Sequence, residues 1–383
     1  MNQTEQVLLN SIRQSLWGTA FEAPADTDWD AVLREAERQT VLGLAIGAAP
    51  PNVQKAWSAK SGTVTANFVR VLYAQSRLLA LLEGNGIPTV ILKGAAAAVY
   101  YPHPAQRSMG DIDYLVPLAQ FDAAKELLLE NGYTFDDDPR YPRHAHVGRD
   151  GVSLEQHRFF SSDGLDIEAY ITDGMQHIEH RVIDGNAFPM LPKLANGLVL
   201  LAHLMQHLKT GLGLRQVIDW MLYVHTELDD AFWNAAFSKA ARETGLEKAA
   251  VTVTRLCQMC LGLPDEIGWC RHADPALCDE LLESLLSSGN FNRKRARGSA
   301  VETVTSNIAR KGIFRYLQTA GECNWKAYHR HGWLRPFAWA YQIGRYAKQG
   351  FAARRSGGQL KEDLRRGKAR SALLKKLGIS ENQ

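Results

Sequence analysis

Two aspartates, Asp111 and Asp113, stand one residue apart in the segment GDIDYLV. In a β-strand, side chains at positions i and i+2 point to the same face, so these two carboxylates can converge on one point. Two carboxylates held this close repel each other unless a positive charge neutralises them. A hard divalent cation with oxygen ligands, such as Mg²⁺, is the usual partner, and such cations commonly handle phosphate groups. The pair therefore predicts a cation site at the start of a strand.

An apolar run and a glycine precede this pair. Residues 87–92 (IPTVIL) are rich in β-branched side chains, which predicts a short buried strand. Gly94 ends the run and permits close approach of the backbone, and residues 95–101 predict a short helix. The free N–H groups at the start of a helix attract anions, and Lys93 adds a positive charge. We expect Lys93, Gly94 and Ala95 to form a phosphate-binding turn.

Arginine and histidine side chains supply further candidates. Arg107 precedes Asp111 by four residues, and its planar guanidinium suits either a γ-phosphate or one aspartate. We place Arg107 and Ser108 in the nucleotide site. His144 and His146 lie in an arginine-bearing loop, where they either touch a nucleotide or substrate or remain solvated.

A third acid is expected on a predicted hairpin. Residues 152–160 and 165–172 look like strands, and the four-residue link between them contains a glycine. Asp166 and Glu168 share one face of the second run, and Glu155 on the first run can point to the same side. The alternative is that these acids form only the solvated face of a sheet.

The segments LKG, YY and R-S-M-G-D-I-D-Y-L-V together resemble an uncharacterised bacterial nucleotidyltransferase family of the DNA polymerase β-type superfamily. The resemblance implies a paired-acid strand and a third acid on a later strand, which it places at Asp166. It therefore implies that Asp111, Asp113 and Asp166 are catalytic and bind Mg²⁺ or Mn²⁺, with two ions. The chain departs from the pattern twice. Ala95 stands where many relatives have Ser or Gly, which leaves only the backbone to bind phosphate, and Glu168 stands where related sequences often show His.

A helical stretch at residues 196–224 carries the rest of the resemblance. Arg215 and Asp219 are an i,i+4 pair that follows a glycine break, and His207 precedes the break. These three residues resemble the H…R…D signature of the family and are expected to brace the cleft or touch the nucleotide. The alternative is a buried polar network that locks two helices together. His203 shares a face with His207, but a metal site there needs a third ligand, which the sequence does not reveal.

Composition limits the class of protein. The 383-residue chain has no apolar run of about 18 residues, so we expect no transmembrane helix. Its N-terminal segment lacks the pattern of a secretory signal, and the default expectation is a cytoplasmic location. Cys257 and Cys260 lie within an apolar helical pattern, which favours buried free thiols over a zinc site.

The predicted fold class is α+β, with a small mixed β-sheet core between two helical regions. We expect a helical region at residues 1–85, a nucleotidyltransferase core at 86–185, a helical domain at 186–340 and a basic tail at 341–383. The tail holds eleven Lys or Arg and three Asp or Glu. We expect its last part, from residue 357, to be loosely ordered, and the tail suits an anionic partner. No basic and aromatic stripe flanks the acids, so sequence-specific nucleic-acid binding is not expected.

These observations predict transfer of a nucleoside monophosphate from an NTP to an acceptor hydroxyl, with release of pyrophosphate. The acceptor class (small molecule, sugar or protein) stays open, as does the preferred base. Two alternatives remain: a catalytically weak protein that binds a nucleotide or a partner on the same fold, and a phosphotransferase that moves the γ-phosphate.

Overall fold

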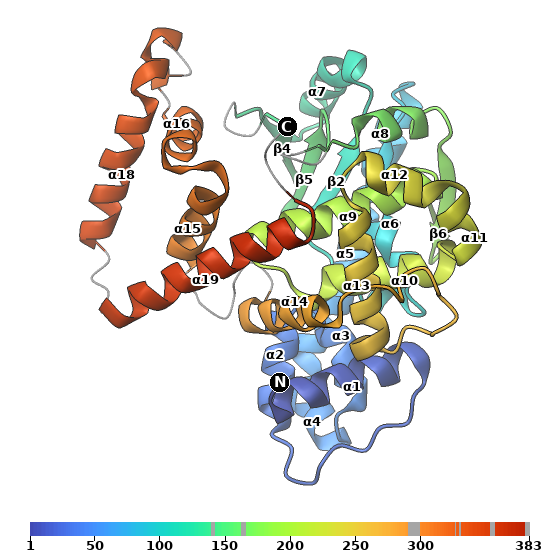
Figure 1. Cartoon of the computed structure of the whole chain (residues 1–383). Helices are drawn as coiled ribbons and strands as arrows, with labels where there is room; N and C mark the ends of the chain where they lie inside the picture. Colours follow the sequence, from blue (N-terminus) through green and yellow to red (C-terminus); the bar gives the residue numbers. More distant parts are fainter. Residues whose placement is uncertain are drawn as a thin grey trace.

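The computed structural model of the chain describes residues 1–138, 142–161, 166–289, 299–325, 327–328, 331–352 and 357–379. Within them a mixed sheet of seven strands lies between helical regions, which confirms the predicted α+β fold class (Figure 1). The strands are β1 (Val90–Leu92), β2 (Ile112–Leu115), β3 (Thr134–Asp136), β4 (His144–Arg149), β5 (Val152–His157), β6 (Glu179–Ile183) and β7 (Asn186–Met190).

Strand β2 occupies the middle of the sheet, whose order is β3-β4-β5-β2-β1-β7-β6. It runs antiparallel to β1 and parallel to β5, and β1 runs parallel to β7. Strands β4 and β5 form a hairpin through Asp150 and Gly151, which both adopt positive φ angles (52° and 72°), as tight hairpin turns require. The hairpin therefore places β4 and β5 beside the aspartate-bearing strand.

One face of the sheet packs against α5 (Ser58–Gly84) and α7 (Phe121–Glu130). Residues of β2 that point this way, Ile112 and Tyr114, are buried with Phe68 of α5 and Leu128 of α7. The alternation of strand side chains therefore turns Asp111 and Asp113 toward the opposite face. The other N-terminal helices are α1 (Gln3–Trp17), α2 (Trp29–Arg38), α3 (Leu42–Ala45) and α4 (Pro51–Ala56).

The opposite face belongs to a larger helical core. It includes α9 (Lys193–Thr210) and α10 (Leu214–Glu227), which meet closely enough that a Cβ on Gly197 would overlap the Tyr223 ring. Cys257 of α13 (Glu247–Leu261) is a buried free thiol, as predicted, and burial raises its pKa. The remaining helices of this region are α6 (Gly94–Ala98), α8 (Glu168–Gly174), α11 (Asp230–Phe232), α12 (Ser238–Glu243) and α14 (Pro275–Ser288).

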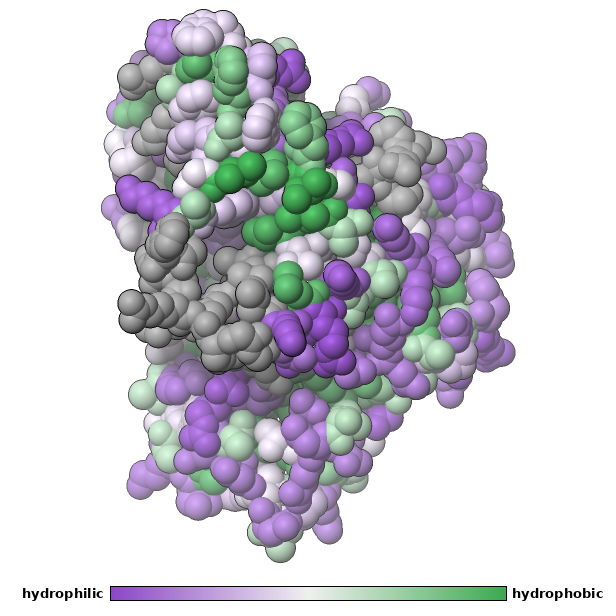
Figure 2. Space-filling view, turned by 60° about the vertical axis from the view of Figure 1, so that its left-hand side comes forward, coloured by the Kyte–Doolittle hydropathy of each residue, from purple (hydrophilic) through white to green (hydrophobic). Residues whose placement is uncertain are grey.

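The C-terminal part forms a helical arm beside the body (Figure 1). The arm contains α15 (Ser299–Lys311), α16 (Ile313–Asn324) and α18 (Ala338–Ala352). It exposes several large hydrophobic side chains, and Figure 2, turned to bring this side forward, shows hydrophobic and hydrophilic surfaces side by side. The exposed hydrophobic residues include Ile313, Phe314, Trp333, Phe337 and Ile343.

The expectation of a loosely ordered segment from residue 357 is wrong for residues 357–379. Helix α19 (Gly357–Lys376) returns from the arm to the body, where Leu373 and Leu377 are fully buried. Arg370 forms a buried ion pair with Glu302, and Lys376 contacts Glu280 at 2.6 Å. An apolar helix face with paired cations therefore fixes part of the basic tail.

The predicted hairpin of residues 152–160 and 165–172 is also wrong. The partner of β5 is β4, in the histidine-bearing segment that was predicted to be a loop, and residues 168–174 are helical. Polar side chains explain the helix, because Asp166 Oδ1 accepts from the Glu168 N–H at 3.1 Å and Glu168 accepts from the N–H groups of Phe160 and Ser161. Such local hydrogen bonds compete with a strand ladder.

Candidate active site

A cleft of about 720 Å³ opens between the sheet, the N-terminal helices and α9–α10. Its walls carry both acids and cations, a combination that suits a polyanion bound through cations. The charged residues that line it are Glu37, Lys60, Lys93, Arg107, Asp111, Asp113, Arg143, Glu155 and Arg215.

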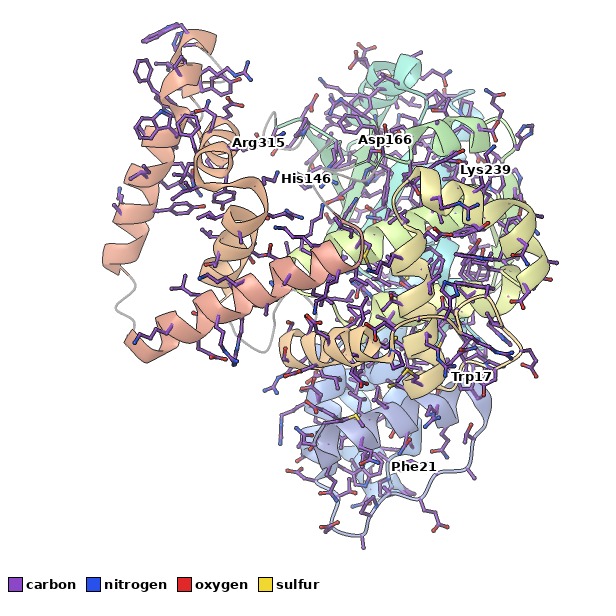
Figure 3. All side chains as sticks on the ribbon, in the orientation of Figure 1. Trp17, Phe21, His146, Asp166, Lys239 and Arg315 are labelled. Atoms are coloured by element: carbon purple, nitrogen blue, oxygen red, sulfur yellow. The ribbon has the colours of Figure 1, made fainter. Side chains whose placement is uncertain are left out.

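Three carboxylates form what we call the acid group: Asp111, Asp113 and Glu155. Asp113 pairs directly with Glu155 in the β2–β5 register, and one oxygen from each of the three side chains lies within 4.8 Å of the other two. Asp166 is not in this group. It is exposed near the start of α8 (Figure 3), and its Oδ1 accepts hydrogen bonds from Ser161 and Glu168. The structure thus brings Glu155, rather than Asp166, to the aspartate pair.

A signal for Glu155 was present in the sequence. The resemblance includes a third acid followed two residues later by histidine, and Glu155 with His157 has this spacing. The prediction preferred Asp166 because the incorrect hairpin placed it on the next strand. With β5 beside β2, Glu155 lies directly across from Asp113.

Two positive or proton-donating groups face Asp113. Lys93 Nζ lies 2.6 Å from Asp113 Oδ1, and His157 Nε2 lies 2.9 Å from the same oxygen. Burial disfavours the charged carboxylate, but Lys93 and His157 together hold the pKa of Asp113 below its ordinary value. Lys93 has a φ of 54° and precedes Gly94 at 33°, a strained conformation of the kind that concentrates at functional sites.

The other two carboxylates have weaker partners: Glu155 lies 3.4 Å from His144 Nε2 and 3.6 Å from His157 Nε2, and the charge of Lys93 acts on both acids without a short contact. Burial, with the nearby charge of Asp113, raises the pKa of Glu155 to about 8, and burial followed by Asp113 also raises the pKa of Asp111. The acid group therefore carries more negative charge than Lys93 balances. Three converging carboxylates with excess charge fit a divalent cation that prefers oxygen ligands.

Arg107 is occupied by a carboxylate outside the acid group. Its Nε and Nη2 donate to the two oxygens of Asp219 at 2.8 Å each, and the Tyr101 hydroxyl donates to Asp219 Oδ1 at 2.8 Å. All three side chains are buried. Of the two roles expected for Arg107, the structure shows pairing with a carboxylate, although the partner lies on α10 and is neither member of the aspartate pair.

The expected Arg215–Asp219 pair is wrong, because Asp219 is taken by Arg107. Arg215 instead donates from Nη1 to the backbone oxygen of Ser108 at 3.0 Å and lines the cleft. Its buried Nε has no hydrogen-bond acceptor among the residues that the structure describes. Arg215 thus adds a guanidinium to the lining of the cleft, and its charge acts on Asp111.

The remaining predicted residues lie in different surroundings. His207 lines the cleft, its Nε2 lies 2.9 Å from His203 Nε2, and burial lowers its pKa to about 3. Gly94 and Ser108 also line the cleft. The Ala95 methyl is fully buried in the core behind the sheet. The Glu168 carboxylate accepts a hydrogen bond from the Phe160 N–H and so contacts the segment before α8.

The mixed sheet and its acid group define an α+β protein with a polar, charged cleft. The family model described as "Uncharacterised nucleotidyltransferase" matches residues 25–262, more than half of the chain. The chain belongs to this family, which gives it a general role in nucleotidyl transfer and an NTP substrate. No curated protein matches the chain. None of the described helices is both long and apolar enough to cross a membrane.

Proposed function

We propose that the protein transfers a nucleoside monophosphate from an NTP to an acceptor hydroxyl and releases pyrophosphate. The observation that carries this proposal is the convergence of Asp111, Asp113 and Glu155 in a cleft that is also lined by lysine and arginine side chains. An acid group with this excess of negative charge suits divalent cations better than it suits a purely structural role.

Asp111, Asp113 and Glu155 are the residues that would hold Mg²⁺ or Mn²⁺ in this proposal. Bound there, the ions supply neutralisation of the phosphate charge and a lowered pKa of the attacking hydroxyl. Glu155 takes the role that the sequence assigned to Asp166. Its place across from Asp113 in the β2–β5 register supports this assignment.

The chain's own cations bind and orient the triphosphate. Lys93 reaches the cleft from the strained turn beside Gly94, and Arg215 and Arg143 reach it from α10 and from the segment before β4. Fixed positive groups in a partly enclosed cleft stabilise developing charge without reorganising, so positioning and electrostatics form the protein's main contribution. Arg107 does not bind the triphosphate directly in this proposal, because its guanidinium is paired with Asp219.

The test is incubation of the full chain with each of the four NTPs, labelled at the α or the γ position, with Mg²⁺ or Mn²⁺. Transfer of α label to an acceptor in added extract, with release of pyrophosphate, is the expected result. Transfer of γ label would instead establish a phosphotransferase. Binding without any transfer would favour the nucleotide-binding alternative. Asp111→Asn is the control for contaminating enzymes, since it keeps the side-chain shape and removes a carboxylate.

A further inference from the structure

Four polar side chains form a two-by-two array on one face of the β4–β5 hairpin. In the antiparallel register His144 pairs with His157 and His146 pairs with Glu155. Directly opposed side chains on one face lie close enough to act on a shared group. The alternating residues Ala145 and Val147 point into the core behind the sheet, so the polar members all face the cleft side.

Three members of this array form what we call the histidine group: His144, Glu155 and His157. His144 Nε2 lies 3.4 Å from Glu155 Oε1, and His157 Nε2 lies 3.6 Å from Glu155 Oε2. One potential ligand atom from each of the three residues lies within 4.8 Å of the other two. His146 Nδ1 is 3.9 Å from Glu155 Oε1 and is more exposed than the others.

These separations match those between ligands of one metal ion. Nitrogen and oxygen ligands lie about 2.0–2.1 Å from zinc, so two of them in a tetrahedron are about 3.4 Å apart. An ion bound to His157 Nε2 would replace the proton in the hydrogen bond between this nitrogen and Asp113 Oδ1.

The ligand types distinguish this group from the acid group. The acid group offers only carboxylate oxygens, which suit Mg²⁺, whereas imidazole nitrogens favour zinc and neighbouring transition metals. The two groups share Glu155 and differ in the rest of their members. We propose that His144, Glu155 and His157 form a second cation site, selective for Zn²⁺-like transition-metal ions, which adjoins the acid group through Glu155.

The low exposure of the histidine group supports a preorganised metal site. The side chains of His144, Glu155 and His157 are 12%, 18% and 7% exposed, so the ligands are held in place by packing before any ion arrives.

The experiment measures Zn²⁺ binding to the metal-stripped, full-length, untagged chain without nucleotide, by competition with a chromophoric chelator. Co²⁺ absorption reports the ligand geometry. The proposal predicts a zinc site whose affinity falls on the order of 100-fold or more in His144→Ala and is kept in Asp111→Asn, which lies outside the histidine group. His180→Ala, on β6 away from the cleft, is the matched histidine control and should bind as the unaltered chain does.

Three results would overturn the proposal: no zinc binding, binding unchanged in His144→Ala, or binding lost in Asp111→Asn but kept in His144→Ala. The second result would point to cysteine thiols and the third to the acid group. His144→Gln serves as a second variant, with circular dichroism as the check on folding. Because no nucleotide is present, failure here leaves the proposed nucleotidyl transfer untouched, and failure of transfer leaves zinc binding measurable.

Discussion

Two clusters of charged side chains border the same cleft: the cluster around Asp219 is buried, whereas the acid group ranges from the exposed Asp111 to the buried Asp113. Around Asp219, one carboxylate meets a bidentate guanidinium and a hydroxyl, so each oxygen of the acid has a short donor. In the acid group three carboxylates converge, and the two shortest contacts, from Lys93 Nζ and His157 Nε2, both go to Asp113 Oδ1. The charge of Asp219 is therefore neutralised by residues of the chain itself. In the acid group, by contrast, the pKa values of Asp111 and Glu155 are raised. The contrast is consistent with a structural role for the Asp219 cluster, and it supports the proposal that the acid group binds cations.

The largest expected effect is on the Asp219 cluster. Arg107→Met leaves Asp219 buried without its cation and should lower the free energy of unfolding by about 3–5 kcal/mol. The double variant Arg107→Met/Asp219→Leu should lose less than the single one, because no unpaired charge remains. Urea unfolding measures both.

Arg242→Ala, which breaks the exposed pair with Glu247, is the matched control and should change the unfolding free energy by no more than about 0.5 kcal/mol. An Arg107→Met cost as small as the control's would remove the distinction between the two clusters.

The acid group should respond in the opposite direction. Asp111→Asn removes the carboxylate charge that Asp113 repels, so the metal-free protein should gain on the order of 1 kcal/mol in unfolding free energy. The same change should lower nucleotidyl transfer by about 100-fold or more, since it removes a cation ligand. Unfolding in chelator and transfer of α label are the two measurements.

Asp265→Asn, on a side chain that is 86% exposed, should alter neither quantity. A metal-free protein that is destabilised by Asp111→Asn would show that Asp111 is a structural acid.

A smaller effect is the pH dependence of stability in the metal-free protein. The folded-state pKa of Glu155 is about 8 against an ordinary value of 4.5, so the folded chain keeps a proton that the unfolded chain has lost. Stability must therefore fall as pH rises through this window, by on the order of 1 kcal/mol between about pH 7 and 8.

Buried histidines, whose pKa values are lowered, act in the other direction. Because their ordinary value of 6.5 leaves them partly protonated in the unfolded chain at pH 7, they offset part of the slope near pH 7 and progressively less toward pH 8. Urea midpoints at several pH values should show the slope in the unaltered chain and a flatter one in Glu155→Gln. Equal slopes would mean that Glu155 is ionised in the metal-free state.

The smallest effect concerns Asp166, which the sequence analysis predicted as the third catalytic acid. Asp166→Ala removes acceptors at the start of α8 and should cost about 1 kcal/mol, as the loss of a helix cap does. Mg²⁺ affinity, measured by calorimetry, should stay the same within error. A clear loss of Mg²⁺ binding would place Asp166 among the cation ligands.

Much of the fold was predictable because its signals are local. The apolar run before Gly94, the aspartate pair and the glycine break before Arg215 each indicate an element through nearby residues, and β1, β2 and the start of α10 follow. The general nucleotidyl transfer role was predictable from the same motifs, and the family match confirms it.

The third acid depended on which strands pair, and periodicity does not determine pairing. Both Glu155 and Asp166 lie in alternating segments, and the local hydrogen bonds that Asp166 and Glu168 accept from the backbone decide that the second segment is not a strand. The partner of Arg107 was missed for a similar reason. Asp219 lies 112 residues further along the chain, and tertiary packing alone brings the two together.

The most direct test of the account compares Glu155→Gln with Asp166→Asn in transfer of α label from NTP in the presence of Mg²⁺. The account predicts that Glu155→Gln loses transfer by about 100-fold or more, while Asp166→Asn stays within a few-fold of the unaltered chain. The reverse order, with Glu155→Gln active and Asp166→Asn inactive, would contradict the claim that Asp111, Asp113 and Glu155 form the cation site.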